Sequence, residues 1–84
     1  MDFMYRTRGT CAVEIRLQLE GGKVHGVTFA GGCDGNLKGI CQLVEGVDAR
    51  EVIAKLEGIR CGRKPTSCPD QLAQALKQAL AAQK

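Results

Sequence analysis

The chain has 84 residues, of which twelve are Lys or Arg and nine are Asp or Glu, giving a net charge of +3. A chain of this length buries only about 60% of its unfolded surface, so we expect one domain with one modest core over residues 1–84. The small charge excess does not favour nucleic acid as a partner. The sequence also lacks both an apolar stretch of the roughly 20 residues that a membrane span needs and a leader pattern at its start, so we expect a cytoplasmic protein.

The N-terminal part of the chain is predicted to form strands. From Cys11 to Leu19 apolar and polar residues alternate, which is typical of a strand with one buried face. The pair Gly21-Gly22 separates this run from a second β-prone run, Lys23 to Ala30, and predicts a tight antiparallel hairpin. Alternation of Phe3 and Tyr5 adds a short edge strand, so the sheet should have two or three antiparallel strands.

The hydrophobic period changes to that of helices after the glycine-rich segment 31–35. An apolar stripe predicts a first helix over about residues 36–45, ended by Gly46. Asp48, with Glu51 three residues later, predicts the start of a second helix over about residues 49–57. A third begins at Ser67 or Cys68. We therefore expect an α+β fold with three helices packed on one face of the sheet.

Five cysteines in a small cytoplasmic chain indicate thiols or metal ligands, and an odd number cannot all pair within one chain. No C-x-x-C pair is present, so a metal site would have to be assembled from separate elements. Cys41 lies in the apolar stripe of the first helix and is predicted to be a core residue. Cys33 and Cys68 precede helices, whose free N–H groups stabilise a thiolate. Cys61 has the basic neighbours Arg60 and Arg63.

Two other features leave alternatives open. The glycine-rich segment, with Gly31, Gly32 and Gly35, is a candidate anion or cofactor loop, although it lacks the spacing of known phosphate-binding motifs. The basic segment Arg60 to Lys64 is either a solvated loop or a contact for an anion or a protein partner. His25 is interpreted as an exposed strand residue. Three aromatic residues in all argue against recognition of nucleic acid by base stacking.

The run Thr66-Ser67-Cys68-Pro69-Asp70 resembles the signature of the TSCPD domain family, and the similarity extends over about residues 11–80. Matching segments include Gly31-Gly32-Cys33, Gly35-Asn36-Leu37 and Cys61-Gly62. The resemblance implies a relation to the domain appended to adenosylcobalamin-dependent ribonucleotide reductases, with cysteines suspected of binding metal and a reductase as a candidate partner. The chain is too small for complete reductase chemistry, and we assign no catalytic residue.

A second resemblance is to iron–sulfur cluster assembly scaffolds. Cys11, Cys33 and Cys68 occupy the three places where those proteins carry cysteines: the start of a strand, the segment between strand and helix, and the start of the last helix. Ser67 stands where the scaffolds have a histidine. This resemblance implies a similar fold, with cluster-assembly proteins as candidate partners.

The leading hypothesis combines these observations in one site. Cys11, Cys33, Cys61 and Cys68 would supply four thiolates, a set that suits zinc or an iron–sulfur cluster in an auxiliary or scaffold domain. One alternative is a metal-free thiol redox or persulfide carrier that uses Cys33 and Cys68. Another is a nucleotide or nucleic-acid binding accessory that uses the glycine-rich and basic segments. The sequence leaves the oligomeric state open.

Overall fold

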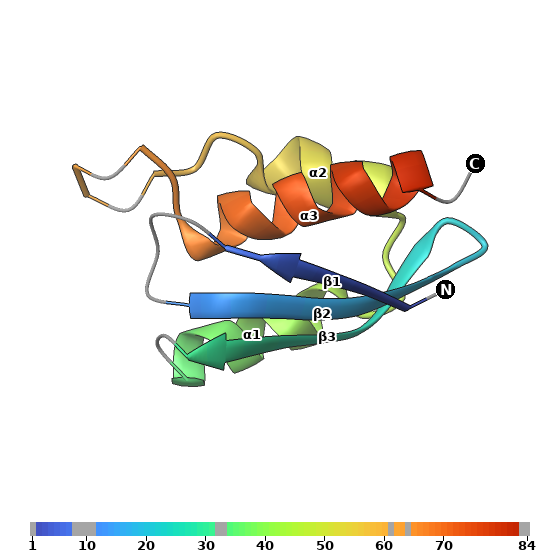
Figure 1. The fold of residues 1–84 in the computed structure, drawn as a ribbon, viewed down its shortest axis with the longest axis horizontal. Helices are drawn as coiled ribbons and strands as arrows, with labels where there is room; N and C mark the ends of the chain where they lie inside the picture. The colour runs from blue at the N-terminus through green and yellow to red at the C-terminus, as the bar shows by residue number, and fades with distance from the viewer. Residues whose placement is uncertain (1, 8–11, 32–33, 61, 64, 83–84) are drawn as a thin grey trace.

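A computed structural model describes residues 2–7, 12–31, 34–60, 62–63 and 65–82 of the chain. A three-stranded antiparallel sheet of order β1-β2-β3 precedes three helices, which confirms the expected α+β class (Figure 1). The strands are β1 (Asp2–Arg6), β2 (Ala12–Glu20) and β3 (Lys23–Gly31). The helices are α1 (Asp34–Val44), α2 (Ala49–Leu56) and α3 (Cys68–Ala82).

Glycines make the hairpin between β2 and β3. Glu20 pairs with Lys23, and the two residues between them, Gly21 and Gly22, have φ angles of +59° and +79°. Two consecutive positive φ angles match the right-handed twist of the flanking strands and are readily adopted by glycine. The predicted tight turn is therefore confirmed.

The edge strand β1 is also confirmed. It pairs antiparallel with β2, with Phe3 opposite Leu17 and Tyr5 opposite Ile15. Phe3 and Tyr5 pack against the core, whereas Asp2, Met4 and Arg6, which alternate with them, are exposed. Because side chains alternate between the two faces of a strand, Phe3 and Tyr5 of β1 lie on the same, core-facing side of the sheet as Leu17 and Ile15 of β2.

The helices follow the expected order with small shifts at their ends. Helix α1 begins at Asp34, two residues earlier than predicted, and ends at Val44. Gly35 and Gly39 are tolerated inside it. Helix α2 is capped as predicted, because the Asp48 side chain accepts a hydrogen bond from the Arg50 amide.

Sheet and helices form two layers. Helix α3 packs on β1 and β2 and is flanked by α2, while α1 packs on β3 (Figure 1). In β2 the side chains of Ile15, Leu17 and Leu19 are buried beneath the helices, whereas those of Arg16, Gln18 and Glu20 are exposed. The largest fully buried side chains are Ile15, Leu17, Leu19, Val24, Leu72 and Leu76.

The connection between α1 and α2 is tied to the start of the hairpin's second strand. The Val24 amide donates to the Val47 carbonyl at 2.9 Å, and the Ala49 amide donates to the Gly22 carbonyl at 2.9 Å. These bonds satisfy the polar backbone of a non-helical segment beside the core. They hold α2 in register with the sheet, so the chain that follows α2 starts from a defined position.

Candidate functional site at the start of helix α3

The N-terminus of α3 carries Cys68 as its first residue. Ser67 precedes it as the N-cap: its hydroxyl oxygen accepts a hydrogen bond from the Asp70 amide at 3.1 Å. Pro69 lies in the first turn, where the missing N–H leaves no helical bond unmade. The predicted start of the helix is therefore confirmed, and the cap is Ser67 and not Cys68.

Around this cap the structure buries several polar side chains. Thr66, Ser67, Asp70 and Gln71 are each less than a tenth exposed. The Thr66 hydroxyl donates to Oδ2 of Asp70 and accepts from the Gln71 side chain at 3.0 Å. The Gly58 amide donates to Oδ1 of Asp70 at 2.7 Å, and the Ser67 hydroxyl donates to the Ile59 carbonyl at 2.7 Å. The buried side-chain polar atoms of the described residues all have partners.

The Asp70 carboxylate remains ionised in this setting. Burial raises its pKa, but the hydrogen bonds from Thr66, the Gly58 amide and Gln74 together lower the pKa by more than burial raises it. The pKa of Asp70 therefore lies below its ordinary value. Three polar residues of the signature run are thus engaged in folding the start of α3. The sequence analysis missed this role, although Ser67 and Asp70 stand at the spacing of a helix-capping pattern.

The thiol of Cys68 is left half-buried beside this network. Cys68 and Cys41, the cysteines within the described ranges, are both free. The other three predicted ligands, Cys11, Cys33 and Cys61, lie outside the described residues. Among the residues that are described, no three His, Cys, Asp or Glu side chains lie close enough to hold a metal ion. As a donor set, cysteine thiolates fit zinc or iron in an iron–sulfur cluster.

Cys41 lies where the sequence analysis placed it, packed against the core from α1. Burial raises the pKa of its thiol, which keeps it protonated near neutral pH. It also lines a hollow of about 360 Å³ between β3 and α1, together with Phe29 and Leu37. A protonated thiol in such surroundings behaves as a small apolar side chain.

The glycine-rich segment differs from the expected loop. Gly31 is the last residue of β3 and Gly35 lies in the first turn of α1, so both belong to regular structure. Gly32 lies outside the described residues. Gly31 has a φ angle of +78°, which glycine adopts without strain, so it turns the chain at the end of the strand.

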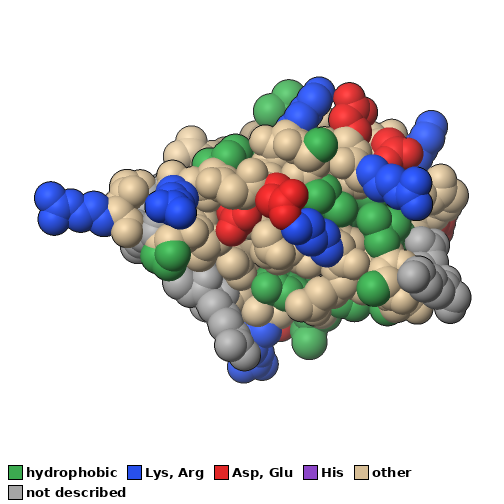
Figure 2. Space-filling model, turned by 90° about the horizontal axis from the view of Figure 1, so that it is seen from above, with side chains coloured by type: hydrophobic (Ala, Val, Ile, Leu, Met, Phe, Trp, Pro, Cys, Tyr) green, Lys and Arg blue, Asp and Glu red, His purple; other side chains and the backbone are tan. Residues whose placement is uncertain are grey.

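The segment before α3 is strongly basic, as the sequence indicated. Arg60 and Arg63 are exposed, and Lys64 lies outside the described residues. The loop projects from one end of the molecule in Figure 1, and Figure 2 shows Lys and Arg side chains at that projecting end.

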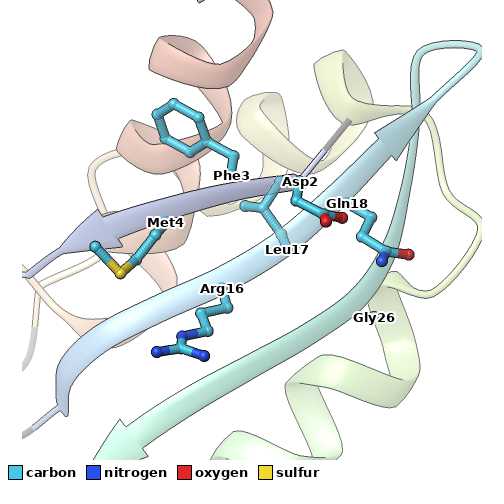
Figure 3. A pocket seen from close by; sticks show the side chains of 7 residues that line it. All are labelled: Asp2, Phe3, Met4, Arg16, Leu17, Gln18 and Gly26. Atoms are coloured by element: carbon cyan, nitrogen blue, oxygen red, sulfur yellow. The ribbon is translucent and has the colours of Figure 1, made fainter.

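A second hollow, of about 380 Å³, lies on the sheet. Figure 3 shows that Met4 and Arg16 lie on the face turned away from the helices, whereas Phe3 points toward α3. Asp2 and Gln18 complete the polar part of its lining. The lining combines the negative charge of Asp2, the positive charge of Arg16 and the apolar side chain of Met4, so it does not select one class of ligand.

None of the described helices is both long enough and apolar enough to cross a bilayer.

Comparison with known proteins gives one clear result. The family model of the TSCPD domain matches residues 3–80, which is nearly the whole chain. Comparisons with curated proteins and with solved structures gave no match. The match includes both the sheet and the start of α3 with its buried signature residues. The chain therefore belongs to the TSCPD domain family and is a small domain of the kind associated with ribonucleotide reductases.

Proposed function

We propose that this domain binds zinc or an iron–sulfur cluster through Cys11, Cys33, Cys61 and Cys68, and acts as an auxiliary or scaffold module. The observation that carries the proposal is the cross-strand pairing of Ala12 with Gly31. Cys11 directly precedes the first of these residues, and Cys33 follows the second by two positions. Paired strands lie about 5 Å apart, so chain connectivity favours two thiols at the same end of the sheet.

The position of Cys68 supports the same site. It is the first residue of α3, which packs on β2 and β1. Figure 1 shows the start of β2, the end of β3 and the start of α3 toward the same end of the molecule's long axis. Cys61 belongs to the chain segment that leads into α3, so all four thiols are expected near this end.

Four thiolates from four separate segments would make a closed structural site for zinc or hold a cluster. A bound metal would supply a cross-link between the sheet end, the basic loop and α3, and a cluster would add redox or cluster-delivery chemistry. A small domain gains most from such a link because its own core contributes little stability. The protein partner served by the site would be a ribonucleotide reductase or a cluster-assembly protein.

Metal analysis tests the proposal directly. Wild type, Cys68→Ser and Cys41→Ser are purified without oxygen, and zinc, iron and acid-labile sulfide are measured before and after supplying the metal. We expect stoichiometric zinc, or iron with sulfide, in wild type and Cys41→Ser, and a large loss in Cys68→Ser. The control is matched because Cys41 is a free thiol packed against the core. A wild-type protein that stays metal-free after reconstitution would overturn the proposal.

A further inference from the structure

The buried polar cluster before α3 connects two chain segments on either side of the basic loop. On one side are the backbone groups of Gly58 and Ile59, which follow α2. On the other are Ser67 and Asp70, at the start of α3. We call the side chains of Thr66, Ser67 and Asp70, with the Gly58 amide and the Ile59 carbonyl, the loop clasp.

The clasp bonds both ends of the loop. The Gly58 amide donates to Asp70 at 2.7 Å, and the Ile59 carbonyl accepts from the Ser67 hydroxyl at 2.7 Å. Thr66 reinforces the contact from the loop side by donating to the other carboxylate oxygen. Because these groups are buried or part-buried, water competes weakly for the bonds, and an unpaired partner would be costly.

The hydrogen-bond partners of Asp70 differ from those of an acidic residue in an ordinary capping box. In a capping box the acidic side chain at the third helical position reaches back to the amide of the N-cap residue. Here its oxygens accept instead from Gly58, Thr66 and Gln74. The carboxylate therefore ties the helix to the chain before the loop, a contact that a helix cap alone does not require.

The loop enclosed by the clasp contains Cys61, and Cys68 directly follows Ser67. We infer that the clasp is a positioning device: by fixing the chain on both sides of the loop, it sets the distance between the two ends of the segment that carries Cys61 and leads into Cys68. The inference rests on the proposed function. Because folding already fixes the two ends of the loop, metal binding would have to order fewer residues and would lose less conformational entropy. Thr66 and Asp70 are accordingly positioning residues for the thiol site.

Two variants test the inference, with one control. Thr66→Val removes the hydroxyl at nearly constant volume, and Asp70→Asn removes the charge. Val52→Ala destabilises the core from α2, where Val52 is buried and outside the clasp. The zinc dissociation constant is measured by competition with a chromophoric chelator, and thermal melting is followed for all three metal-free variants.

We expect Thr66→Val and Asp70→Asn each to raise the zinc dissociation constant by about tenfold or more, as loss of outer-shell support does at metal sites. Val52→Ala should leave the zinc dissociation constant unchanged even if its melting temperature falls by as much as those of Thr66→Val and Asp70→Asn. A merely structural role for Thr66 and Asp70 would instead weaken zinc binding only in proportion to lost stability. Equal effects of Asp70→Asn and Val52→Ala at matched melting temperature would overturn the inference.

Amide hydrogen exchange in the metal-free protein separates this inference from the proposed function. Asp70→Ala leaves the Gly58 amide without its side-chain acceptor, so faster exchange of that amide, with protection in β2 retained, supports the clasp whether or not zinc binds. A wild-type protein without zinc affinity would refute the proposed function, and the clasp would then be judged by exchange. Unchanged protection of Gly58 in Asp70→Ala would overturn the clasp.

Discussion

Nδ1 of His25 lies 2.7 Å from Oε2 of Glu45, across twenty positions of sequence. The other oxygen of the same carboxylate accepts a hydrogen bond from the Gly26 amide at 2.9 Å. Gly26 has a φ angle of +58° and lies at a register shift between β2 and β3, so its amide is turned out of the regular ladder. Glu45 thus joins the end of α1 to the irregular part of β3.

The first prediction concerns the pH dependence of this contact. The hydrogen bond from the Gly26 amide, followed by that from His25, holds the pKa of Glu45 below its ordinary value. A lowered folded-state pKa means that the contact stabilises the fold fully above the unfolded value of about 4.3, and that this stabilisation is lost as pH falls through the folded value. Glu45→Gln should therefore melt at a lower temperature than wild type at pH 7, and the gap should close toward pH 3.

Thermal melting from pH 7 to pH 3 checks this expectation, with Glu20→Gln as a charge-matched control. Glu20 is exposed at the end of β2. A gap between wild type and Glu45→Gln that stays constant over the whole pH range would contradict the assigned role of the carboxylate.

The second prediction compares two helix caps. Ser67 is 4% exposed and makes two bonds, accepting from the Asp70 amide and donating to the Ile59 carbonyl, whereas Asp48 is exposed and accepts from the Arg50 amide. Ser67→Ala should cost about 2–3 kcal/mol of unfolding free energy, since it removes a cap and leaves a carbonyl unpaired, and Asp48→Ala about 1 kcal/mol. Urea denaturation measures both, and an equal loss would show that the bond to Ile59 contributes nothing.

The third prediction compares glycine-to-alanine substitutions at two positions, one with a positive φ angle and one inside a helix. Gly22 has a φ angle of +79° in the hairpin, so Gly22→Ala should destabilise the protein by about 1–2 kcal/mol. Gly39 lies within α1, and an added Cβ would meet nothing within 4 Å. Gly39→Ala should stabilise it by about 0.5–1 kcal/mol, because alanine loses less backbone entropy in a helix. Denaturant midpoints that move in the same direction would contradict the backbone assignment.

The fourth prediction contrasts two leucines. Leu76 is 0% exposed in α3, and Leu76→Ala should cost about 2–5 kcal/mol through lost burial and a residual cavity. Leu43 is 80% exposed in α1, and Leu43→Ala should change the unfolding free energy by no more than about 0.5 kcal/mol. Both are measured by thermal and urea unfolding, and a large loss for Leu43→Ala would mean that this side chain is covered in solution.

Much of the fold follows from short-range pattern. Alternation in β2, the glycine pair after Glu20 and the capping residue Asp48 each set local backbone preferences, so the elements and their order could be predicted. The boundary of α1 was less predictable, because Gly35 reads as a loop residue although the helix includes it. A helix end depends on packing against the sheet as much as on propensity.

Some features of the candidate site could likewise be predicted from the sequence, and others could not. The fold class, the signature run and a start of α3 at Ser67 or Cys68 could be predicted, since each depends on residues close together along the chain. The hydrogen bonds of Asp70 with Gly58, twelve positions away, of Ser67 with Ile59 and of Glu45 with His25 were found in the three-dimensional structure alone. Such bonds form where packed helices and strands bring distant groups together, and no local pattern encodes that geometry.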